Sequence, residues 1–382
     1  MSGLYIHIPF CKQACHYCDF HFSTSMGKKE AMLIALHKEI ELRKAEFKNE
    51  TVETIYFGGG TPSVLSATEI NALIASVYKN YTVSENPEIT LEANPDDLSI
   101  QKIEELSASK VNRLSIGIQS FFEEDLKLMN RAHNAAEAEN CITEASKYFD
   151  NISIDLIYGI PEMSNERWLQ NINKALSYNL PHISSYALTV EPKTALEKFI
   201  TTGKVKPVTD SVSQEHHSIL VSELEKAGYI NYEFSNFGKP DYFSRNNTAY
   251  WQGKKYLGIG PSAHSFNGKN RSWNINNNPK YIKALSENRF PSETEKLSVA
   301  DRYNEYVMTG LRTIWGVSLE EVEQNFGKRY ADYLQKESAL KIENGLLKLE
   351  NNVLLITTKG KFLSDGIASD LFLVNLESLT KS

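Results

Sequence analysis

Three of the four cysteines in the chain lie within eight residues, at Cys11, Cys15 and Cys18, in the segment HIPFCKQACHYCDF. Four thiolates would complete a structural zinc site or a common iron–sulfur centre. The C-x3-C-x2-C spacing instead offers three thiolates, which can bind three irons of a [4Fe–4S] cube and leave the fourth iron open to a non-protein ligand. An open iron indicates a reactive site rather than a structural one.

Two other interpretations of this cysteine cluster stay open. A disulfide fragment fits poorly, because the number of neighbouring cysteines is odd and no hydrophobic signal segment precedes them. A zinc ion is the stronger alternative, since zinc accepts mixed sulfur, nitrogen and oxygen ligands. The residues close enough in sequence to supply a fourth zinc ligand are His7, His16, His21 and Asp19.

Composition limits the class of protein. The chain has 382 residues, 41% of them hydrophobic, which is enough for two or three units or for one barrel with an appendage. A net charge of −7 offers no general surface for nucleic acids. No apolar run approaches the roughly 18–20 residues of a membrane span. With unpaired cysteines and no export signal, these features predict a cytoplasmic protein.

Strand-like and amphipathic segments alternate through the first half of the chain. The expected strands are 4–9, 53–58, 88–93, 113–119, 151–158 and 182–190, and the expected helices are 28–47, 66–79, 99–108, 134–148 and 164–178. Serial βα units give parallel strands with right-handed crossovers. Strands rich in β-branched residues on both faces favour a barrel. We therefore expect an α/β fold in which residues 1–190 form a partial (β/α)6 barrel, with a flat doubly wound sheet as the alternative.

The remaining chain divides into two parts. Residues 191–296 predict an irregular α/β extension, with a helix at 209–227, a strand at 229–237 and a loop-rich stretch. Residues 297–374 predict a mostly helical, winged-helix-like module for packing or a lid. Its expected elements are helices 298–313, 318–326 and 328–343, a hairpin turning at Asn351–Asn352, and a helix at 358–372. A frayed tail is expected over 375–382.

Motifs with chemical potential follow successive strands. FGGGTPS (57–63), LEANP (91–95) and GIQSF (117–121) end the second, third and fourth expected strands, and Asp155 lies in the fifth. Functional residues of parallel β/α folds gather where strands end, so we expect these motifs to converge on one cavity with the cysteines. The glycines allow a ligand to approach the backbone, although a tight turn explains them equally well.

Four polar side chains of these segments suit a small polar ligand. Glu92 and Gln119 offer groups for hydroxyls or an amino group, Arg131 suits a carboxylate, and Asp155 accepts from a hydroxyl or an amine. Taken singly, each also fits a structural or solvated role.

Together these motifs resemble the radical S-adenosylmethionine (SAM) superfamily, whose signature is the C-x3-C-x2-C triad with an aromatic residue before the last cysteine, here Tyr17. The chain is more closely similar to the oxygen-independent coproporphyrinogen III oxidase-like branch, which contains HemN-type oxidases and HemW-type haem chaperones. The resemblance covers about residues 4–310 and a family-like C-terminal module. The segments that carry it are YIHIPFC, YFGGGTPS, EANP, RLSIGIQSF, RAH and IDLIYGIP.

The resemblance implies a role for each motif. Cys11, Cys15 and Cys18 would bind a [4Fe–4S] cluster, and the amino and carboxylate groups of SAM would bind its open iron. The residues implied for SAM are Tyr5, Tyr17, Gly59, Gly60, Thr61, Glu92, Gln119, Arg131 and Asp155. An electron from the cluster would cleave the sulfonium bond to give a 5′-deoxyadenosyl radical, and this chemistry belongs to the cofactors.

Two departures favour the haem-chaperone side of the branch. HemN-type oxidases resemble C-x3-C-x2-C-x-C and carry an N-terminal extension, whereas here Phe20 stands at the extra cysteine position and ten residues precede Cys11. We therefore expect a protein that binds haem and hands it to client haemoproteins, membrane-associated respiratory enzymes among them, with an electron donor for the cluster. A radical SAM oxidoreductase acting on coproporphyrinogen III stays the alternative.

The haem ligand is not specified by this resemblance. HemW-type chaperones resemble H-N-x-x-Y-W, and this chain reads NNTAYW, so Asn247, Tyr250 and Trp251 match while Asn246 replaces the histidine. An amide is a poor axial ligand for haem iron. His264 is a replacement ligand to consider, although a hydrogen-bonding role in its loop fits it equally. Cys141 lies in a helical pattern, which is typical of an inert core thiol.

Overall fold

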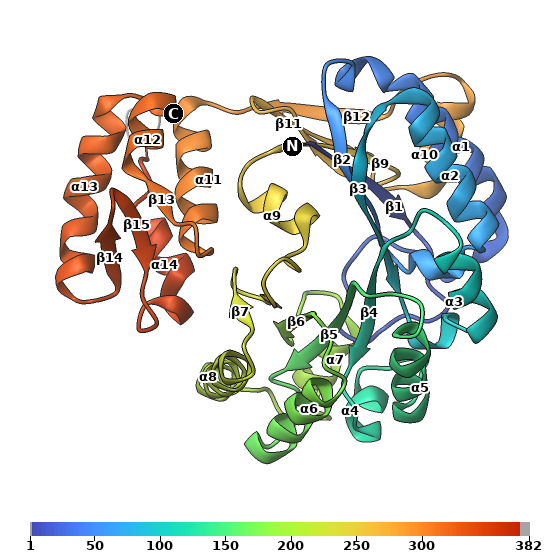
Figure 1. Ribbon diagram of the computed structural model, residues 1–382, viewed down its shortest axis with the longest axis horizontal. Coiled ribbons are helices and arrows are strands. Elements are labelled where there is room, and N and C mark those ends of the chain that lie inside the picture. The colour runs from blue at the N-terminus through green and yellow to red at the C-terminus, as the bar shows by residue number, and fades with distance from the viewer. Residues whose placement is uncertain (1, 375–382) are drawn as a thin grey trace.

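A computed structural model describes residues 2–374 of the protein, and the tail expected at 375–382 lies outside the described residues. One sheet of twelve strands dominates these residues, in the order β12-β11-β10-β9-β1-β2-β3-β4-β5-β6-β8-β7. The sheet curves around an interior, with helices on its outer side (Figure 1). The prediction of an α/β barrel-like fold is confirmed, and the flat doubly wound alternative is not.

The parallel part of the sheet contains all six expected strands. They are β1 (Ser2–Ile8), β2 (Thr51–Gly59), β3 (Thr82–Ala93), β4 (Arg113–Gln119), β5 (Ile152–Tyr158) and β6 (His182–Ala187). A seventh parallel strand, β9 (Lys255–Ile259), pairs with β1 on its other side and was not expected. Its apolar core is too short to stand out in the sequence, and its partner lies some 250 residues away.

The outer helices form where the amphipathic segments predicted them. They are α1 (Lys29–Leu42), α2 (Ala67–Asn80), α3 (Ile100–Ser107), α5 (Ala135–Ala145) and α6 (Asn165–Ser177). Capping boxes start α2 at Ser66 and α5 at Asn134, where each cap side chain accepts from the amide three residues on. The first helix ends earlier than expected, because the chain continues as a 3-10 turn at Lys44–Phe47.

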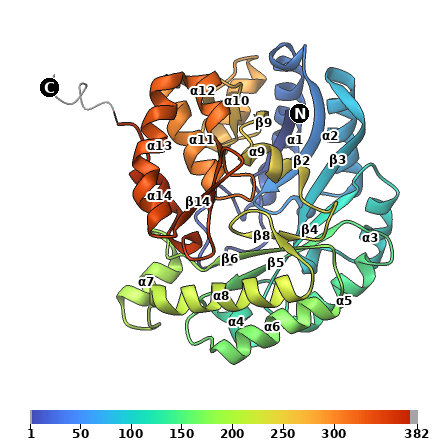
Figure 2. The ribbon, with the colours of Figure 1, turned by 60° about the vertical axis from the view of Figure 1, so that its left-hand side comes forward.

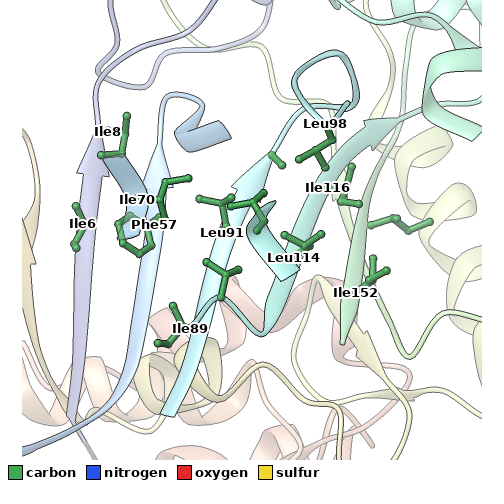
Figure 3. Close-up of a cluster of buried hydrophobic side chains, with 14 of the residues drawn as sticks. Ile6, Ile8, Phe57, Ile70, Ile89, Leu91, Leu98, Leu114, Ile116 and Ile152 are labelled. Atoms are coloured by element: carbon green, nitrogen blue, oxygen red, sulfur yellow. The ribbon is translucent and has the colours of Figure 1, made fainter. Parts of the chain in front are cut away.

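The main core lies between this sheet and these helices. Residues two apart on each strand place apolar side chains on the same face, as Ile6 and Ile8 of β1 and Leu114 and Ile116 of β4 do (Figure 3). Ile70 of α2 packs against this layer. Burial of this face determines which side chains of each strand point toward the helices. The alternate side chains point to the opposite face of the sheet, which is left for polar residues.

The middle of the chain is more regular than the sequence suggested. The expected helix is α8 (Asp210–Lys226), but the expected strand at 229–237 is wrong, because it divides into β7 (Ile230–Asn231) and β8 (Asn236–Gly238) around a turn. The stretch expected as loops adds the strands β9 to β12 to the β1 edge of the sheet. The remaining elements of the first 296 residues are α4 (Glu123–Leu128), α7 (Ala195–Thr201), α9 (Arg245–Trp251), β10 (His264–Phe266), β11 (Asn270–Asn274), α10 (Asn278–Ser286) and β12 (Ser292–Lys296).

A buried polar network holds β9 in place beside β1. Arg43 Nη1 donates to Gly258 O at 2.7 Å, and Gly260 N donates to Glu39 Oε2 at 2.8 Å. Asn274 Nδ2 donates to Glu39 Oε1 at 2.8 Å, and Arg43 and Glu39 also form an ion pair. Because all three side chains are buried, loss of any one partner would leave a charge or a polar group unsatisfied.

The C-terminal residues form a mostly helical unit with its own core, drawn in orange to red beside α9 and β7 (Figures 1 and 2). Its elements are α11 (Val299–Leu311), β13 (Val317–Ser318), α12 (Leu319–Phe326), α13 (Lys328–Glu343), β14 (Leu347–Glu350), β15 (Val353–Ile356) and α14 (Ser364–Asp370). The predicted hairpin turns at Asn351 and Asn352, both with positive φ, as asparagines favour. The last helix is shorter than expected. The division into three domains stays a prediction.

Among residues 2–374, no helix is both long and apolar enough to cross a membrane.

Candidate functional site

A cavity of about 880 Å³ is lined by residues from the ends of the parallel strands and from the middle of the chain. One side, which we call the SAM-side wall, consists of Tyr5, Tyr56, Gly59 and Glu92. The other side, which we call the α9-side wall, consists of Asn247, Tyr250, Trp251 and His264. The structure therefore brings two groups of predicted residues, about 150 positions apart in sequence, to one cavity of the size that ligand sites usually have.

The cysteine loop follows β1 directly, and all three of its thiols are free. The loop returns to its start, since Cys11 N donates to Ser23 O at 3.1 Å. Thr61 Oγ1 lies 3.4 Å from Cys11 Sγ and donates to it. Burial, together with the neighbouring cysteines, raises the pKa of Cys11 and of Cys18 to about 11. Without a metal these two cysteines are therefore thiols at neutral pH.

Arg131 ties the cysteine loop to the ends of two strands. Its Nη1 donates to Cys15 Sγ at 3.3 Å and to Tyr17 Oη at 3.4 Å. Its Nη2 donates to Asn94 Oδ1 at 2.6 Å, next to β3, and to Gly117 O at 2.9 Å in β4. Its Nε is buried and has no partner among the described residues. The guanidinium therefore has one buried donor that no described residue satisfies.

The three histidines considered for a zinc site bond to other partners. His7 bonds to Tyr5 Oη through Nδ1 at 3.2 Å and to His21 O through Nε2 at 2.9 Å. His16 Nδ1 bonds to Leu128 O, and His21 Nε2 bonds to Asn278 Oδ1. Within residues 2–374, no three His, Cys, Asp or Glu side chains are gathered around one ion-sized position.

The glycine motif brings the end of β2 against the cysteine loop. Gly60 N donates to Ile8 O at 2.9 Å, and Thr61 N donates to Phe10 O at 2.7 Å. A Cβ atom on Gly60 would lie 2.6 Å from Phe10 O, so only glycine fits there. Gly60 therefore approaches the backbone of the cysteine loop and not a ligand, which agrees with the tight-turn interpretation of this motif. Gly59, with φ of +110°, lines the cavity.

Two partly buried carboxyl groups, Glu92 of the SAM-side wall and Asp155, lie near each other. Tyr56 Oη donates to Glu92 Oε1 at 2.8 Å, and burial, assisted by Asp155, raises the pKa of Glu92 to about 7. Ser115 Oγ donates to Asp155 Oδ1 at 3.4 Å, and burial raises the pKa of Asp155 to about 6. A cationic ligand would favour the ionised form of both groups, so this wall suits a positively charged molecule.

Gln119 occupies a special backbone position at the end of β4. Its φ is +67°, and the pairing with β5 shifts register between Ile116 and Gln119. The amide Nε2 lies close to Gly117, whose missing side chain leaves room for it. The expectation that all motifs line one cavity with the cysteines is met only in part. The predicted residues that do not line the large cavity are Cys11, Cys15, Cys18, Tyr17, Gly60, Thr61, Gln119, Arg131 and Asp155.

Sequence reasoning missed two contributors to this site. Tyr56 is the hydrogen-bond donor to Glu92, and Asn94 is an acceptor for Arg131. Both residues belong to motifs named in the sequence analysis, YFGGGTPS and EANP. Their position at the end of a strand was the feature that could have identified them as site residues.

The α9-side wall is built from a short helix and a neighbouring strand. The ring of Tyr250 lies 6.1 Å from that of Trp251 and 5.2 Å from that of Tyr256, and its side chain is 52% exposed. His264 of β10 is exposed and lies 6.1 Å from the Trp273 ring. Partial desolvation by its neighbours, with the charge of Arg271, lowers the pKa of His264, which favours the neutral imidazole that can bind a metal.

Asn246 has a structural position at the start of α9. Its side-chain Oδ1 accepts from Thr54 Oγ1 at 3.1 Å, and its backbone N–H donates to Glu88 Oε1 at 3.0 Å. The backbone N–H of Asn247 donates to Oγ of the cap residue Ser244 at 3.3 Å. Cys141 is buried in α5, as expected for a core thiol.

Comparison with known proteins agrees with the arrangement of these motifs. Residues 5–175 match the Radical SAM superfamily, and residues 297–363 match the HemN C-terminal domain. The fold is similar to that of coproporphyrinogen III oxidase (HemN) from Escherichia coli, with a TM-score of 0.84 at 24% identity over 97% of this chain and 90% of that chain. Membership of the radical SAM superfamily implies a [4Fe–4S] cluster and SAM.

Curated relatives match over nearly the whole length. The heme chaperone HemW of Bacillus subtilis (strain 168) is 33% identical over 372 residues, which are 96% of this chain and 98% of that protein. The heme chaperone HemW of Lactococcus lactis subsp. lactis (strain IL1403) is 33% identical over 368 residues, 96% of each chain. With the three free thiols, the glycine motif and the shared cavity in the described positions, the chain belongs to the heme chaperone HemW family of radical SAM proteins.

Proposed function

We propose that the protein is a haem chaperone that binds a [4Fe–4S] cluster, SAM and haem, and delivers haem to client haemoproteins. The observation that carries this proposal is the shared cavity, which is lined by both the SAM-side wall and the aromatic α9-side wall. Its full-length relatives carry the printed name heme chaperone.

The cluster would be held by Cys11, Cys15 and Cys18. The donor set fits it, because three free thiols lie in one loop and two of them accept from Thr61 and Arg131. Hydrogen bonds to cysteine sulfur stabilise the thiolate form that iron requires and tune the potential of the centre. When bound, the cluster supplies an electron that can cleave the sulfonium bond of SAM.

SAM would lie against the SAM-side wall. Glu92 and Asp155 would favour its cationic groups, and the free Nε of Arg131 would serve its carboxylate. Tyr5 lies beside Tyr56, with ring centroids 6.1 Å apart and planes 24° apart, and offers a flat surface. Tyr17, Gly59, Thr61 and Gln119 complete the expected set around it.

Haem would lie against the α9-side wall. Tyr250, Trp251 and Phe20, the last 69% exposed, offer large apolar faces to the cavity. His264 lines the same cavity and offers the axial nitrogen that Asn246 lacks. The half-exposed aromatic rings suit a ligand that has to leave again.

The alternative function is a coproporphyrinogen III dehydrogenase-like oxidoreductase. The observation that favours it is the fold, which is similar to that of HemN over most of both chains. Phe20 stands where the HemN-type pattern has a fourth cysteine, and this difference favours the chaperone.

A paired experiment separates the two functions. Protein reconstituted anaerobically with iron and sulfide is titrated with haem, and the complex is mixed with an apo-haemoprotein from a respiratory chain. We expect stoichiometric haem binding followed by transfer to the client. The same preparation is incubated with SAM, a reductant and coproporphyrinogen III. Conversion of that porphyrinogen with release of 5′-deoxyadenosine and methionine, without haem transfer, would support the oxidoreductase instead.

The proposed partners are therefore client haemoproteins, with membrane-associated respiratory enzymes among them, and an electron donor for the cluster. We propose a cytoplasmic location, because reduced thiols persist in that compartment.

A further inference from the structure

Arg312 lies where the C-terminal unit meets the cavity. It follows α11 directly, and the chain just beyond it pairs with the middle segment, since Ile314 N donates to Tyr232 O at 3.0 Å and Thr313 bridges to Glu233. Arg312 lines the large cavity and also a smaller one, of about 200 Å³, at this joint. Its position therefore connects the C-terminal unit to the α9-side wall.

The guanidinium of Arg312 rests on aromatic rings. Its Cζ lies 5.4 Å from the centre of the Trp251 ring and 5.3 Å from that of Phe234. Contacts of this kind hold an arginine side chain in place without using its hydrogen-bond donors. The cation is therefore fixed beside Trp251, which belongs to the α9-side wall.

The donors of Arg312 are only partly engaged. Nη1 pairs with Asp365 of α14, whose side chain is 65% exposed, and Nε is buried without a partner among residues 2–374. An ion pair with so exposed a carboxylate contributes little to stability. Glu233 is the other nearby acid. Burial raises its pKa, so its ionised form, which would attract the Arg312 cation, is less favoured. Arg312 can therefore exchange Asp365 for another carboxylate at small cost.

The other cations that line the cavity are less suited to this role. Lys255 is already paired with Glu50, with Nζ to Oε1 at 2.5 Å. Lys254 is exposed at the edge of the cavity. Only an arginine presents a planar fork that matches a carboxylate through two parallel hydrogen bonds.

We propose that Arg312 binds a propionate carboxylate of the tetrapyrrole held in the cavity, and that this carboxylate takes the place of Asp365. The inference rests on the proposed function, which puts haem against the α9-side wall. It adds the group that orients the macrocycle, with its charged edge toward the joint. It also couples ligand occupancy to the contact between Arg312 and α14.

The test compares haem with haem dimethyl ester, in which both propionates are esterified and carry no charge. Each is titrated into wild-type protein and into Arg312→Gln, with binding followed in the Soret region. Loss of a charge-assisted hydrogen-bond pair should weaken haem binding by about tenfold or more. The ester should bind both proteins equally. Arg329→Gln, an exposed arginine of α13, is the matched control and should behave as wild type.

Two further variants keep the test decisive if Arg312→Gln perturbs the joint. Arg312→Lys keeps the charge but not the fork, and should retain part of the preference for haem over its ester. Asp365→Asn removes the competing carboxylate, and should strengthen haem binding by up to about fivefold. Equal loss of haem and ester in Arg312→Gln, or no loss of either, overturns the role of Arg312 while haem binding by wild type still supports the chaperone. Failure of wild type to bind haem would instead reject the proposed function.

Discussion

The two walls of the cavity differ in how their side chains are held. On the SAM-side wall, Glu92 accepts from Tyr56, and burial raises the pKa of both groups. On the α9-side wall, Tyr250 is half exposed and meets its neighbours through ring contacts. A fixed, bonded wall suits a small cofactor that returns to one position. A loosely packed aromatic wall suits a large flat ligand that must enter and leave.

The largest expected effect tests whether the cluster next to the SAM-side wall depends on all three cysteines. Alanine at Cys11, Cys15 or Cys18 should abolish the cluster, because each thiolate would bind a different iron. Iron and sulfide analysis after anaerobic reconstitution should fall from about four of each per chain to near zero. Cys141→Ala, in the core of α5, is the control and should keep the full content. An intact cluster in Cys15→Ala, or zinc as the native metal, would contradict the assignment.

The next effect concerns the buried acid of the SAM-side wall. Burial raises the pKa of Glu92 to about 7, so the folded protein holds a proton that an unfolded chain releases above about pH 4.3. This contribution to stability is complete below that pH and is lost as the pH rises through 7. It amounts to up to about 4 kcal/mol.

Removal of the carboxylate should flatten this pH dependence. Urea unfolding of the cluster-free protein between pH 5 and 8 should show wild type losing stability relative to Glu92→Gln as the pH rises. Glu41→Gln, on the exposed outer side of α1, should follow wild type. Parallel curves for wild type and Glu92→Gln would mean that Glu92 ionises normally, and that the wall is more open than the structure indicates.

A smaller effect measures the SAM contacts one at a time. Glu92→Ala, Gln119→Ala and Asp155→Ala should each weaken SAM binding by about 1–3 kcal/mol, because a buried partner is left unsatisfied. Isothermal titration of the cluster-loaded protein with SAM measures the loss. Gln101→Ala, an exposed glutamine of α3, is the control for Gln119. Unchanged affinity in all three site variants would place SAM elsewhere.

The smallest effect probes the looser wall. Asn246→His restores the family histidine and should tighten haem binding and shift the Soret band toward a histidine-ligated species. The gain is offset by about 1 kcal/mol, because the bond from Thr54 is lost. Asn246→Gln is the control, since it keeps an amide and adds no imidazole.

His264→Ala completes this comparison. It should weaken haem binding in the native protein, because it removes the only histidine of the α9-side wall. Tight haem binding that survives His264→Ala, with no gain from Asn246→His, would move the haem site away from this wall.

The strand pattern and the motifs were readable because their signals are local. The six parallel strands alternate with amphipathic helices, and each chemical motif stands directly at a strand end, so parallel topology alone predicts that Cys11, Gly59 and Glu92 share one rim. The turn at Asn351 and Asn352 is equally local, since their tolerance of positive φ is a property of the residue type.

Where the prediction was wrong, long-range contacts decided the outcome. The segment at 229–237 has the composition of one strand, yet it folds back on itself around a buried turn at Glu233, so that β7 pairs with β8 and β8 pairs with the distant strand β6. The short strand β9 is stable because β1 and the buried Glu39–Arg43 pair hold it. Neither partner is visible in the local sequence.

The sequence by itself determined the cysteine spacing, the order of the βα units and the family resemblance, because each depends on residues within one segment. Only the tertiary structure decided that Gly60 approaches the chain itself, that Tyr56 bonds to Glu92, and that His264 lines the same cavity as Trp251. It also placed Arg312 at that cavity. The physical reason is that burial, charge pairing and cavity shape depend on contacts between segments far apart in the chain. These segments meet only in the folded sheet.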